Sequence, residues 1–203
     1  MKVAMQKRRT SLTPEREATI RRVLALRQKD LTLVLANIHD PHNVSAIYRS
    51  CDAFGVPCVH LYYTDTAFPM LGAKSSASAR KWVQTVRHQN LGSLMAALKE
   101  QDMRVYATSC TPRAKALVNL DLTLPTAFIM GNEHRGVDQE FEGRVDAEVC
   151  IPMYGMIQSF NVSVAAAILL AETSRQRRAA GMYDRSTYSE EEQSALYAEW
   201  AQK

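Results

Sequence analysis

The sequence predicts an α/β fold in which a mostly parallel sheet carries helices on both faces. Short apolar runs typical of buried strands alternate along the chain with longer amphipathic segments typical of helices. The first run, LTLVL at residues 31–35, passes through a polar loop directly into an amphipathic segment, as in a strand–loop–helix unit. With 203 residues, 46% of them hydrophobic, the chain can bury one substantial core.

The sequence favours a cytoplasmic protein without membrane contact. No apolar run approaches the ~20 residues that a membrane helix needs. The basic N-terminus is not followed by the apolar segment of a secretory signal.

A basic helical extension is expected before the first strand, over residues 1–29. Thr13 suits an N-cap and Pro14 suits the first helical position, so a helix should run from there to about Gln28. Residues 1–30 hold nine Lys or Arg against three Asp or Glu, a net charge of +6, whereas the rest of the chain carries −2. Such an arm is typical of proteins that bind a polyanion; a solvated helix face that keeps the protein soluble is the alternative.

The central domain is expected over residues 30–181 and a C-terminal helical tail over residues 182–203. In the tail, Ser189 and Glu192 are placed to form the capping box of a last helix. Within the domain, Asn161 suits the N-cap of a long helix whose first half is strongly apolar. Strands are expected at 31–37, 57–63, 82–88, 103–109, 125–132 and 147–153, and helices at 43–55, 91–101, 137–144 and 161–181.

The cysteines and histidines give no sign of a disulfide framework or a metal site. The four cysteines are Cys51, Cys58, Cys110 and Cys150. They form no C-x-x-C pair, and three of the four lie within or beside apolar runs. This pattern predicts reduced, buried thiols. His39 and His42 lie in a Pro-containing loop without a third clustered ligand, so we expect them to stabilise the loop by hydrogen bonds and we expect no metal.

Three strand ends are followed by unusual polar loops. They are IHDPHN at 38–43, GNEHRG at 131–136 and PMYGMIQSFN at 152–161. Because ligands of open α/β sheets bind beyond the carboxyl ends of the strands, these loops predict a site. Two common phosphate-binding motifs are absent: Gly136 is followed by Val137 rather than by the Lys-Ser/Thr of a P-loop, and there is no G-x-G-x-x-G.

Together the three loops resemble the three motifs of the SPOUT class of RNA methyltransferases. The matching stretches are HDPHNVSAIYR, GNEHRG and IPMYGMIQSFNVSVA, in the order and at the spacing of the family. The greatest similarity is to the TrmH (SpoU) branch, the tRNA (guanosine-2′-O-)-methyltransferases, and it covers roughly residues 13 to 185. The resemblance implies an α/β domain with a C-terminal deep trefoil knot that works as a homodimer and binds S-adenosyl-L-methionine without a metal. Knots are too rare for a sequence pattern to suggest one.

The resemblance assigns five residues to the pocket for S-adenosyl-L-methionine: Thr108, Gly131, Ile151, Met156 and Phe160. Gly131 would let the backbone approach the ligand closely, because it has no Cβ. Ile151, Met156 and Phe160 would form apolar walls and offer main-chain groups to the adenine. For Ile151 and Phe160, ordinary core packing is the alternative that their sequence context alone favours.

Five further residues match the family's catalytic positions: Asn43, Arg49, Glu133, Ser159 and Asn161. In the family the arginine is assigned to activating the ribose 2′-hydroxyl, but a guanidinium stays protonated in proteins. We therefore expect Arg49 to clamp a phosphate and stabilise the alkoxide, with the substrate phosphate taking the proton. Glu133 would hold Arg49 or loop amides in place, and Ser159 and Asn161 would supply hydrogen bonds near the ribose. Asn43 also suits the N-cap of the helix after its loop.

The implied reaction is methylation of a ribose 2′-hydroxyl in tRNA, at guanosine 18 of the D-loop. The alternatives are the same reaction at another tRNA position or on ribosomal RNA, and a catalytically idle RNA-binding protein. The basic arm would bind the tRNA body through its phosphates, by way of Arg8, Arg9, Arg16, Arg21 and Arg22. The run of residues 175–178, with three arginines, is a second candidate for RNA contact.

Overall fold

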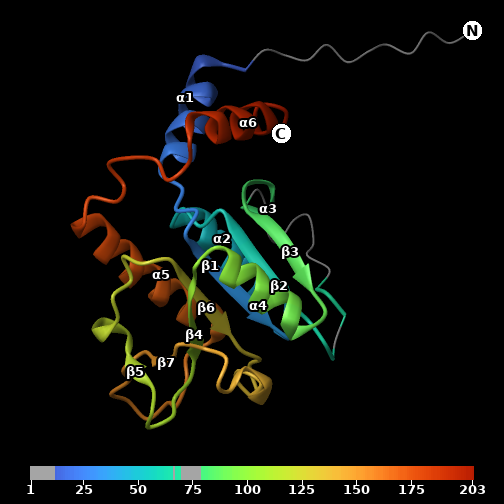
Figure 1. Ribbon diagram of the computed structural model, residues 1–203, viewed down its shortest axis with the longest axis vertical. Helices are drawn as coiled ribbons and strands as arrows, with labels where there is room; N and C mark the ends of the chain where they lie inside the picture. The colour runs from blue at the N-terminus through green and yellow to red at the C-terminus, as the bar shows by residue number, and fades with distance from the viewer. Residues whose placement is uncertain (1–11, 66, 70–78) are drawn as a thin grey trace, which may run out of the picture.

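The computed structural model describes residues 12–65, 67–69 and 79–203 and has the predicted α/β architecture (Figure 1). Seven strands form one sheet in the order β3-β2-β1-β6-β4-β7-β5, and every neighbouring pair is parallel. The strands are β1 (Leu31–Ala36), β2 (Cys58–Tyr62), β3 (Gln84–His88), β4 (Arg104–Thr108), β5 (Lys115–Ala116), β6 (Thr126–Met130) and β7 (Ala147–Cys150). The helices are α1 (Pro14–Ala25), α2 (Pro41–Ala53), α3 (Ala79–Trp82), α4 (Leu91–Glu100), α5 (Val162–Ala179) and α6 (Glu190–Trp200), with 3-10 turns η1 (Leu117–Asn119) and η2 (Gln139–Phe141).

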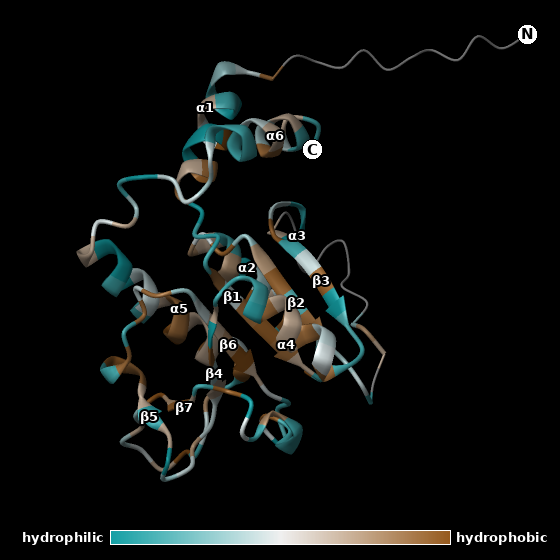
Figure 2. Cartoon of the chain, viewed as in Figure 1, coloured by the Kyte–Doolittle hydropathy of each residue, from teal (hydrophilic) through white to brown (hydrophobic). Residues whose placement is uncertain are grey.

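The central strands are apolar throughout, and helices cover them on both faces. Every residue of β1 and of β6 is buried, as is typical of parallel strands packed between two helical layers. Leu33 and Leu35 of β1 share one core with α2 and α5. Val34, between them, shares the core of the opposite face with Leu94 and Leu98 of α4. Figure 2 shows the resulting apolar strands at the centre of the domain.

The helices at the two chain ends pack together as one helical unit, α1 with α6. Ile20 and Leu24 of α1 and Trp200 of α6 are buried against one another. In Figure 1 this unit lies beyond the end of the sheet at which β1 begins. The expected N- and C-terminal extensions therefore form a single structure, and the exact domain boundaries stay a prediction.

The first helix is shorter than predicted. It ends at Ala25 rather than near Gln28, because Arg27 turns into the protein. The Arg27 guanidinium donates to the Val56 carbonyl (2.9 Å) and pairs with Asp52 (2.5 Å). Two long-range contacts thus end α1 where the local sequence would have continued it.

The second helix begins earlier than predicted, at Pro41. Asp40 is its N-cap, since the Asp40 side chain accepts a hydrogen bond from the N–H of His42 (2.8 Å), and proline is favoured at the first helical position. Asn43 is therefore not the N-cap, and its side chain is available for other contacts. Gly55 ends the helix as predicted, with a φ of +79° that disfavours any residue with a side chain.

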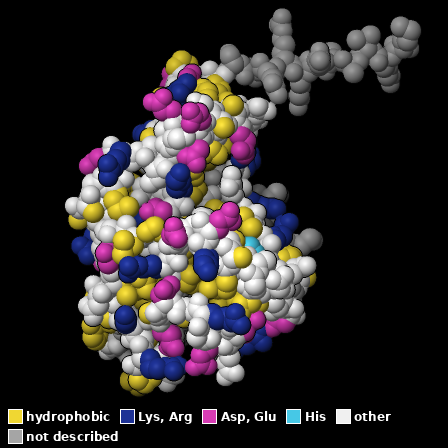
Figure 3. Space-filling view, viewed as in Figure 1, with side chains coloured by type: hydrophobic (Ala, Val, Ile, Leu, Met, Phe, Trp, Pro, Cys, Tyr) yellow, Lys and Arg dark blue, Asp and Glu magenta, His cyan; other side chains and the backbone are white. Residues whose placement is uncertain are grey.

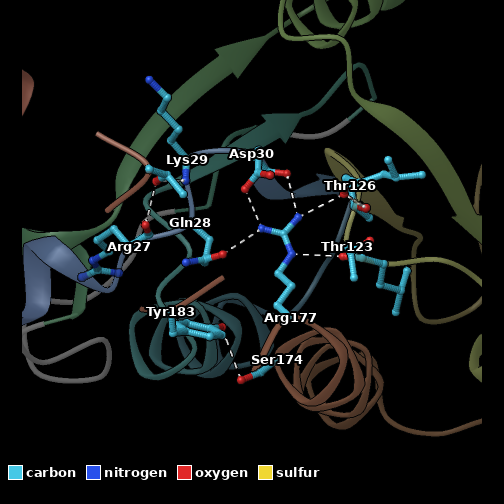
Figure 4. Close-up of polar contacts among 12 residues, drawn as sticks. Arg27, Gln28, Lys29, Asp30, Thr123, Thr126, Ser174, Arg177 and Tyr183 are labelled. Atoms are coloured by element: carbon cyan, nitrogen blue, oxygen red, sulfur yellow. Dashed lines mark hydrogen bonds and ion pairs between the residues drawn. The ribbon is translucent and has the colours of Figure 1, made fainter. Parts of the chain in front are cut away.

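Arg177 is fully buried rather than exposed for RNA contact (Figure 4). Its guanidinium pairs with Asp30 (2.5 Å) and donates to the side chain of Gln28 and to three backbone carbonyl groups. The prediction that residues 175–178 contact RNA is therefore wrong for Arg177, while the other two arginines of the run are exposed.

Smaller expectations also need correction. Residues 137–144 contain only the 3-10 turn η2 in place of the predicted helix. All four cysteines are free, but Cys110 is exposed while Cys51 is buried. In the described ranges, no helix is long and apolar enough to cross a membrane. The trefoil knot, which depends on how the chain threads between these elements, stays a prediction.

Candidate active site

The loops after β1 and β6 meet at the carboxyl ends of these neighbouring strands, where Glu133 joins them. One carboxylate oxygen of Glu133 accepts hydrogen bonds from the N–H of Asp40 (3.4 Å) and from Asn43 Nδ2 (2.9 Å). The other accepts from the N–H of His39 (3.0 Å). Of the two partners expected for Glu133, the loop amides are observed and Arg49 is not.

The protonation state of Glu133 follows from these contacts. Burial raises the pKa of Glu133, but the hydrogen bonds from Asn43 and from the backbone N–H groups more than offset it, so the pKa lies below its ordinary value. Glu133 is therefore an anion at neutral pH. With both oxygens engaged and a lowered pKa, it is a poor general base and a good anchor for the first loop.

Asn43 and Asn161 connect the first loop to the third. Asn161 Nδ2 donates to Asn43 Oδ1 (3.0 Å), while Asn161 Oδ1 accepts from the N–H of Ser163 (2.8 Å) as the N-cap of α5. The N-cap predicted at Asn161 is thus confirmed. Because Asn43 also donates to Glu133, one chain of hydrogen bonds, Glu133–Asn43–Asn161, joins all three motif loops.

The second loop, residues 131–136, folds back on itself. Asn132 and Gly136 exchange two backbone hydrogen bonds of 2.9 Å. A Cβ on Gly131 would lie 2.2 Å from the carbonyl carbon of Gly136, so only glycine fits there. The close approach that Gly131 allows is to its own loop, and its contact with a cofactor stays a prediction. Asn132 Nδ2 also donates to the carbonyl of Asn37 (2.7 Å), which fixes this loop to the end of β1.

A cavity of about 820 Å³ opens at the carboxyl ends of β4, β6 and β7, beside the hydrogen-bond chain. Pockets for molecules of cofactor size span about 300–1,000 Å³. Four of the five residues predicted to hold the cofactor line this cavity: Thr108, Gly131, Ile151 and Phe160. The catalytic candidates Glu133, Ser159 and Asn161 line it as well.

Met156 is the exception among the predicted cofactor residues. Its side chain is 100% exposed and does not line the cavity, whereas Met153 of the same loop does. Residues 152–161 contain no helix or strand, so no periodicity identifies the methionine that faces inward.

The chemistry of the cavity suits S-adenosyl-L-methionine. Ile151, Phe160 and Leu169 supply apolar surface for an adenine ring. Glu142 and Glu148 also line the cavity, where both pair with Arg113 (3.4 and 3.3 Å), while backbone and side-chain groups of the motif loops supply hydrogen-bonding partners. The residues present therefore fit this cofactor.

Arg49 lies apart from the cavity. It is on an exposed part of α2, does not line the cavity, and makes no hydrogen bond or ion pair with another described residue. It follows Asn43 by six positions, about 9 Å along a helix axis at ~1.5 Å per residue. The structure thus joins Asn43, Glu133 and Asn161 by hydrogen bonds and leaves the Arg49 guanidinium available for a substrate.

Two residues with clear roles in the loops were not singled out from the sequence. Asn132 bonds to the end of β1, and Arg135 pairs with Asp65 and with Asp138 (3.1 Å). The sequence feature that indicates both residues is their position in GNEHRG, which directly follows a buried strand.

The histidines of the first loop act through their backbones. The N–H groups of His39 and His42 donate to Glu133 and Asp40, while their imidazoles make no hydrogen bond with a described residue. The part of the chain that the structure describes holds no group of three or more side chains suited to a metal.

The basic residues predicted to bind RNA divide into two groups. Arg16, Arg21 and Arg22 are exposed on α1. Arg21 is partly neutralised by Glu17 at 2.9 Å. The other predicted contacts, Arg8 and Arg9, lie outside the described residues.

Comparison with known proteins places these loops in one family. Residues 30–171 match the SpoU rRNA Methylase family. The chain is 42% identical over 190 residues to the tRNA (guanosine(18)-2′-O)-methyltransferase of Escherichia coli (strain K12), which covers 93% of this chain and 82% of that protein. Identity is also 42%, over 191 residues, to the protein of the same name from Thermus thermophilus, covering 94% of this chain and 98% of that protein.

The fold gives the same result. The crystal structure of the Aquifex aeolicus TrmH/SpoU tRNA modifying enzyme matches with a TM-score of 0.86 at 37% identity, covering 92% of this chain and 95% of that one. With its three motif loops joined beside one cavity and its sequence matched over the whole sheet domain, the chain belongs to the SpoU rRNA methylase family.

Proposed function

We propose that this protein transfers a methyl group from S-adenosyl-L-methionine to the 2′-hydroxyl of guanosine 18 in tRNA. The observation that carries the proposal is the chain Glu133–Asn43–Asn161, which joins the loops of all three motifs at the rim of a cofactor-sized cavity. The choice of tRNA and of guanosine 18 is supported by relatives with that name at 42% identity over almost the whole chain.

Glu133, Asn43 and Asn161 are positioning residues in this proposal. They fix the first and third loops relative to the cavity, so that a ribose held by these loops meets the methyl donor in line. Such alignment is worth several orders of magnitude in rate. Ser159, exposed in the lining of the cavity, supplies a hydroxyl for hydrogen bonding to the ribose.

Arg49 is proposed to bind the phosphate beside the target ribose. Its guanidinium is exposed and has no partner among the described residues, so a substrate phosphate meets no competing carboxylate. Since Arg stays protonated, it cannot accept the hydroxyl proton. That proton passes to a phosphate oxygen of the substrate, and the positive charge of Arg49 stabilises the oxygen that attacks.

S-adenosyl-L-methionine supplies the methyl group as a sulfonium with a neutral leaving group. We propose that Thr108, Gly131, Ile151 and Phe160 hold it. Met153 takes the place expected for Met156, because Met153 lines the cavity. The leaving group is neutral and needs no proton, so the reaction does not require the ionised Glu133 to act as a general acid.

We further propose that the protein is a homodimer. Tyr154, Met156, Ile157 and Val164 are large apolar side chains exposed on the third loop and the first turn of α5. Such clusters mark interaction surfaces, and a second copy of the chain would cover this one. Light scattering at micromolar concentration is expected to give twice the monomer mass, and a monomer would refute the assignment.

The arginines of α1 are proposed to bind the tRNA body. The helical unit lies at the end of the sheet where β1 begins, and the motif loops lie at its other end (Figure 1). A bound RNA must therefore extend along the domain or be shared between two copies. With tRNA as substrate, we place the reaction in the cytoplasm.

The test is to incubate the protein with unmodified tRNA and labelled S-adenosyl-L-methionine and to map the label by nuclease digestion. We expect label at guanosine 18 and none when that nucleotide is 2′-deoxyguanosine. Label at another nucleotide, or only in ribosomal RNA, would refute the position. Tight RNA binding with no label and no calorimetric binding of S-adenosyl-L-methionine would refute the enzyme and favour an idle RNA-binding protein.

A further inference from the structure

A second cavity, of about 230 Å³, lies between the helical unit and the edge of the sheet at β3. It shares no residue with the cavity at the motif loops. Its lining comes from the end of α1, from residues 80–85 and from α6 with the residues beside it. The charged side chains of this lining are four cations and one carboxylate, Arg27, Arg80, Lys81, Lys203 and Glu199.

Two tryptophans, together with Tyr188, form the aromatic part of this lining. The ring centroids of Trp82 and Trp200 are 4.9 Å apart. The Arg27 guanidinium lies 5.3 Å from the Trp200 centroid, and Lys203 Nζ lies 5.8 Å from Trp82 and 5.9 Å from Trp200. These cation–π contacts hold the two cations beside a largely buried aromatic pair, since Trp200 is 6% exposed.

The positive charge of the cavity is incompletely neutralised. Arg27 is 1% exposed and pairs with Asp52, yet its Nε–H is a buried side-chain donor without a partner among the described residues. A buried donor left unpaired is unfavourable, and an acceptor oxygen at the base of the cavity would satisfy it. Lys203 pairs with Glu199 (2.7 Å), but the Lys81 ammonium has no hydrogen bond or ion pair with a described residue.

We propose that this cavity binds a backbone phosphate of the substrate RNA at a distance from the methylated ribose. The inference rests on the proposed function, which supplies the polyanion. Lys81 provides the charge, Arg27 a donor at the base, and the tryptophans an apolar wall. The exposed arginines of α1, Arg16, Arg21 and Arg22, belong to the same helical unit as this cavity. Figure 3 shows the helical unit as a lobe that projects from the sheet domain.

The tryptophans give a direct probe, because the protein has two and both line this cavity. The full chain is titrated with inorganic phosphate while the ionic strength is held constant with chloride, and tryptophan fluorescence is followed. We expect a saturable change that chloride does not produce and that Lys81→Gln weakens at least fivefold. Lys99→Gln removes an exposed lysine on α4 that lines neither cavity, and it should behave as wild type.

A second measurement identifies the phosphate source. The affinity for tRNA is measured from 50 to 200 mM salt. Each neutralised phosphate contributes about 0.9 to the log–log slope, so Lys81→Gln should lower the slope by about 0.9 and the affinity about eightfold at 0.1 M salt. The affinity for S-adenosyl-L-methionine, measured by calorimetry, should not change in either variant.

Three outcomes would overturn the proposal. One is the lack of a saturable response to phosphate, and another is an equal loss in Lys81→Gln and Lys99→Gln. The third is a phosphate response with unchanged tRNA affinity in Lys81→Gln, which would indicate a site for free phosphate. Failure of the proposed function is distinguishable, because wild-type protein would then transfer no methyl group whatever the tryptophans report.

Discussion

Replacement of Arg177 by Met should destabilise the fold strongly without changing the charge that RNA meets. The Arg177 side chain is 0% exposed and lies where α5 crosses the starts of β1 and β6 (Figure 4). It pairs with Asp30 (2.5 Å), bonds to Gln28 (3.2 Å), and donates to the carbonyls of Leu122 (3.0 Å) and Leu124 (3.1 Å). Met fills much of the same volume but offers no donor.

The expected loss follows from what the substitution leaves behind. Removal of one partner of a buried ion pair costs about 3–5 kcal/mol, because the other charge stays without compensation. The orphaned carbonyl groups cost about 1–3 kcal/mol each when water cannot reach them, and these costs overlap with the first. We therefore expect a loss of about 4 kcal/mol in the free energy of unfolding. This is a large part of the ~5–15 kcal/mol that stabilises an ordinary domain.

Urea unfolding measures this loss. For a slope of about 2 kcal/mol per molar, a loss of about 4 kcal/mol lowers the midpoint by about 2 M. Arg178→Met is the matched control, since Arg178 is exposed and its side chain has no hydrogen bond or ion pair with a described residue. It should cost less than about 0.5 kcal/mol. A loss below about 1 kcal/mol for Arg177→Met would refute the reasoning, as would a flatter salt dependence of tRNA binding at a temperature where the variant is folded.

Three further predictions concern the site, the arm and the pH dependence of stability. Arg49→Ala should abolish methyl transfer and leave calorimetric binding of S-adenosyl-L-methionine little changed, and Arg49→Lys should restore little activity, because a point charge does not reproduce the planar fork; loss of cofactor binding would make Arg49 structural. Deletion of residues 1–12, which hold four Lys or Arg and no acid, should lower the log–log salt slope of tRNA binding by one to two units and by at most ~3.6; an unchanged slope would make the arm a solubility tail. Burial, together with the neighbouring His88 ring, lowers the pKa of His60 to about 4. Between pH ~6.5 and 4 the unfolded state therefore binds a proton at His60 that the folded state does not. The free energy of unfolding should accordingly be highest above pH ~6.5 and fall as the pH drops toward 4. Urea unfolding from pH 7 to 4 should show this fall for wild type and a smaller one for His60→Asn, and equal slopes would contradict the assignment.

The strands and helix starts follow from local sequence because local interactions determine them. LTLVL is apolar at every position but one, so it has no exposed face, and it forms a strand buried on both sides. Ser189 and Glu192 form the predicted capping box, and Asn161 caps α5 as predicted. Asp40 took the N-cap role expected of Asn43, because two good capping residues lie within one turn and Pro41 fixes the start after the first of them.

The buried arginines could not be predicted from the sequence in the same way. Arg27 lies in a basic segment and Arg177 in a run with two other arginines, which is typical of an exposed surface. Each can be buried because it forms an ion pair with a carboxylate distant in the sequence. Arg27 pairs with Asp52, and Arg177 pairs with Asp30. Such pairs depend on the tertiary fold, and a composition of mixed charges does not reveal them.

The three motif loops show how the residues of separate motifs depend on one another. Three donors converge on Glu133: the N–H groups of His39 and Asp40 and the amide of Asn43. A carboxylate offers acceptors alone, whereas a Gln would turn an NH₂ group toward one of these donors and leave it unpaired. Asn43 must in turn be an amide, because it donates to Glu133 and accepts from Asn161 at the same time. The identities of all three residues therefore depend on one another through hydrogen bonds that shape the loops, and this dependence explains why the three motifs together are more specific than any one of them.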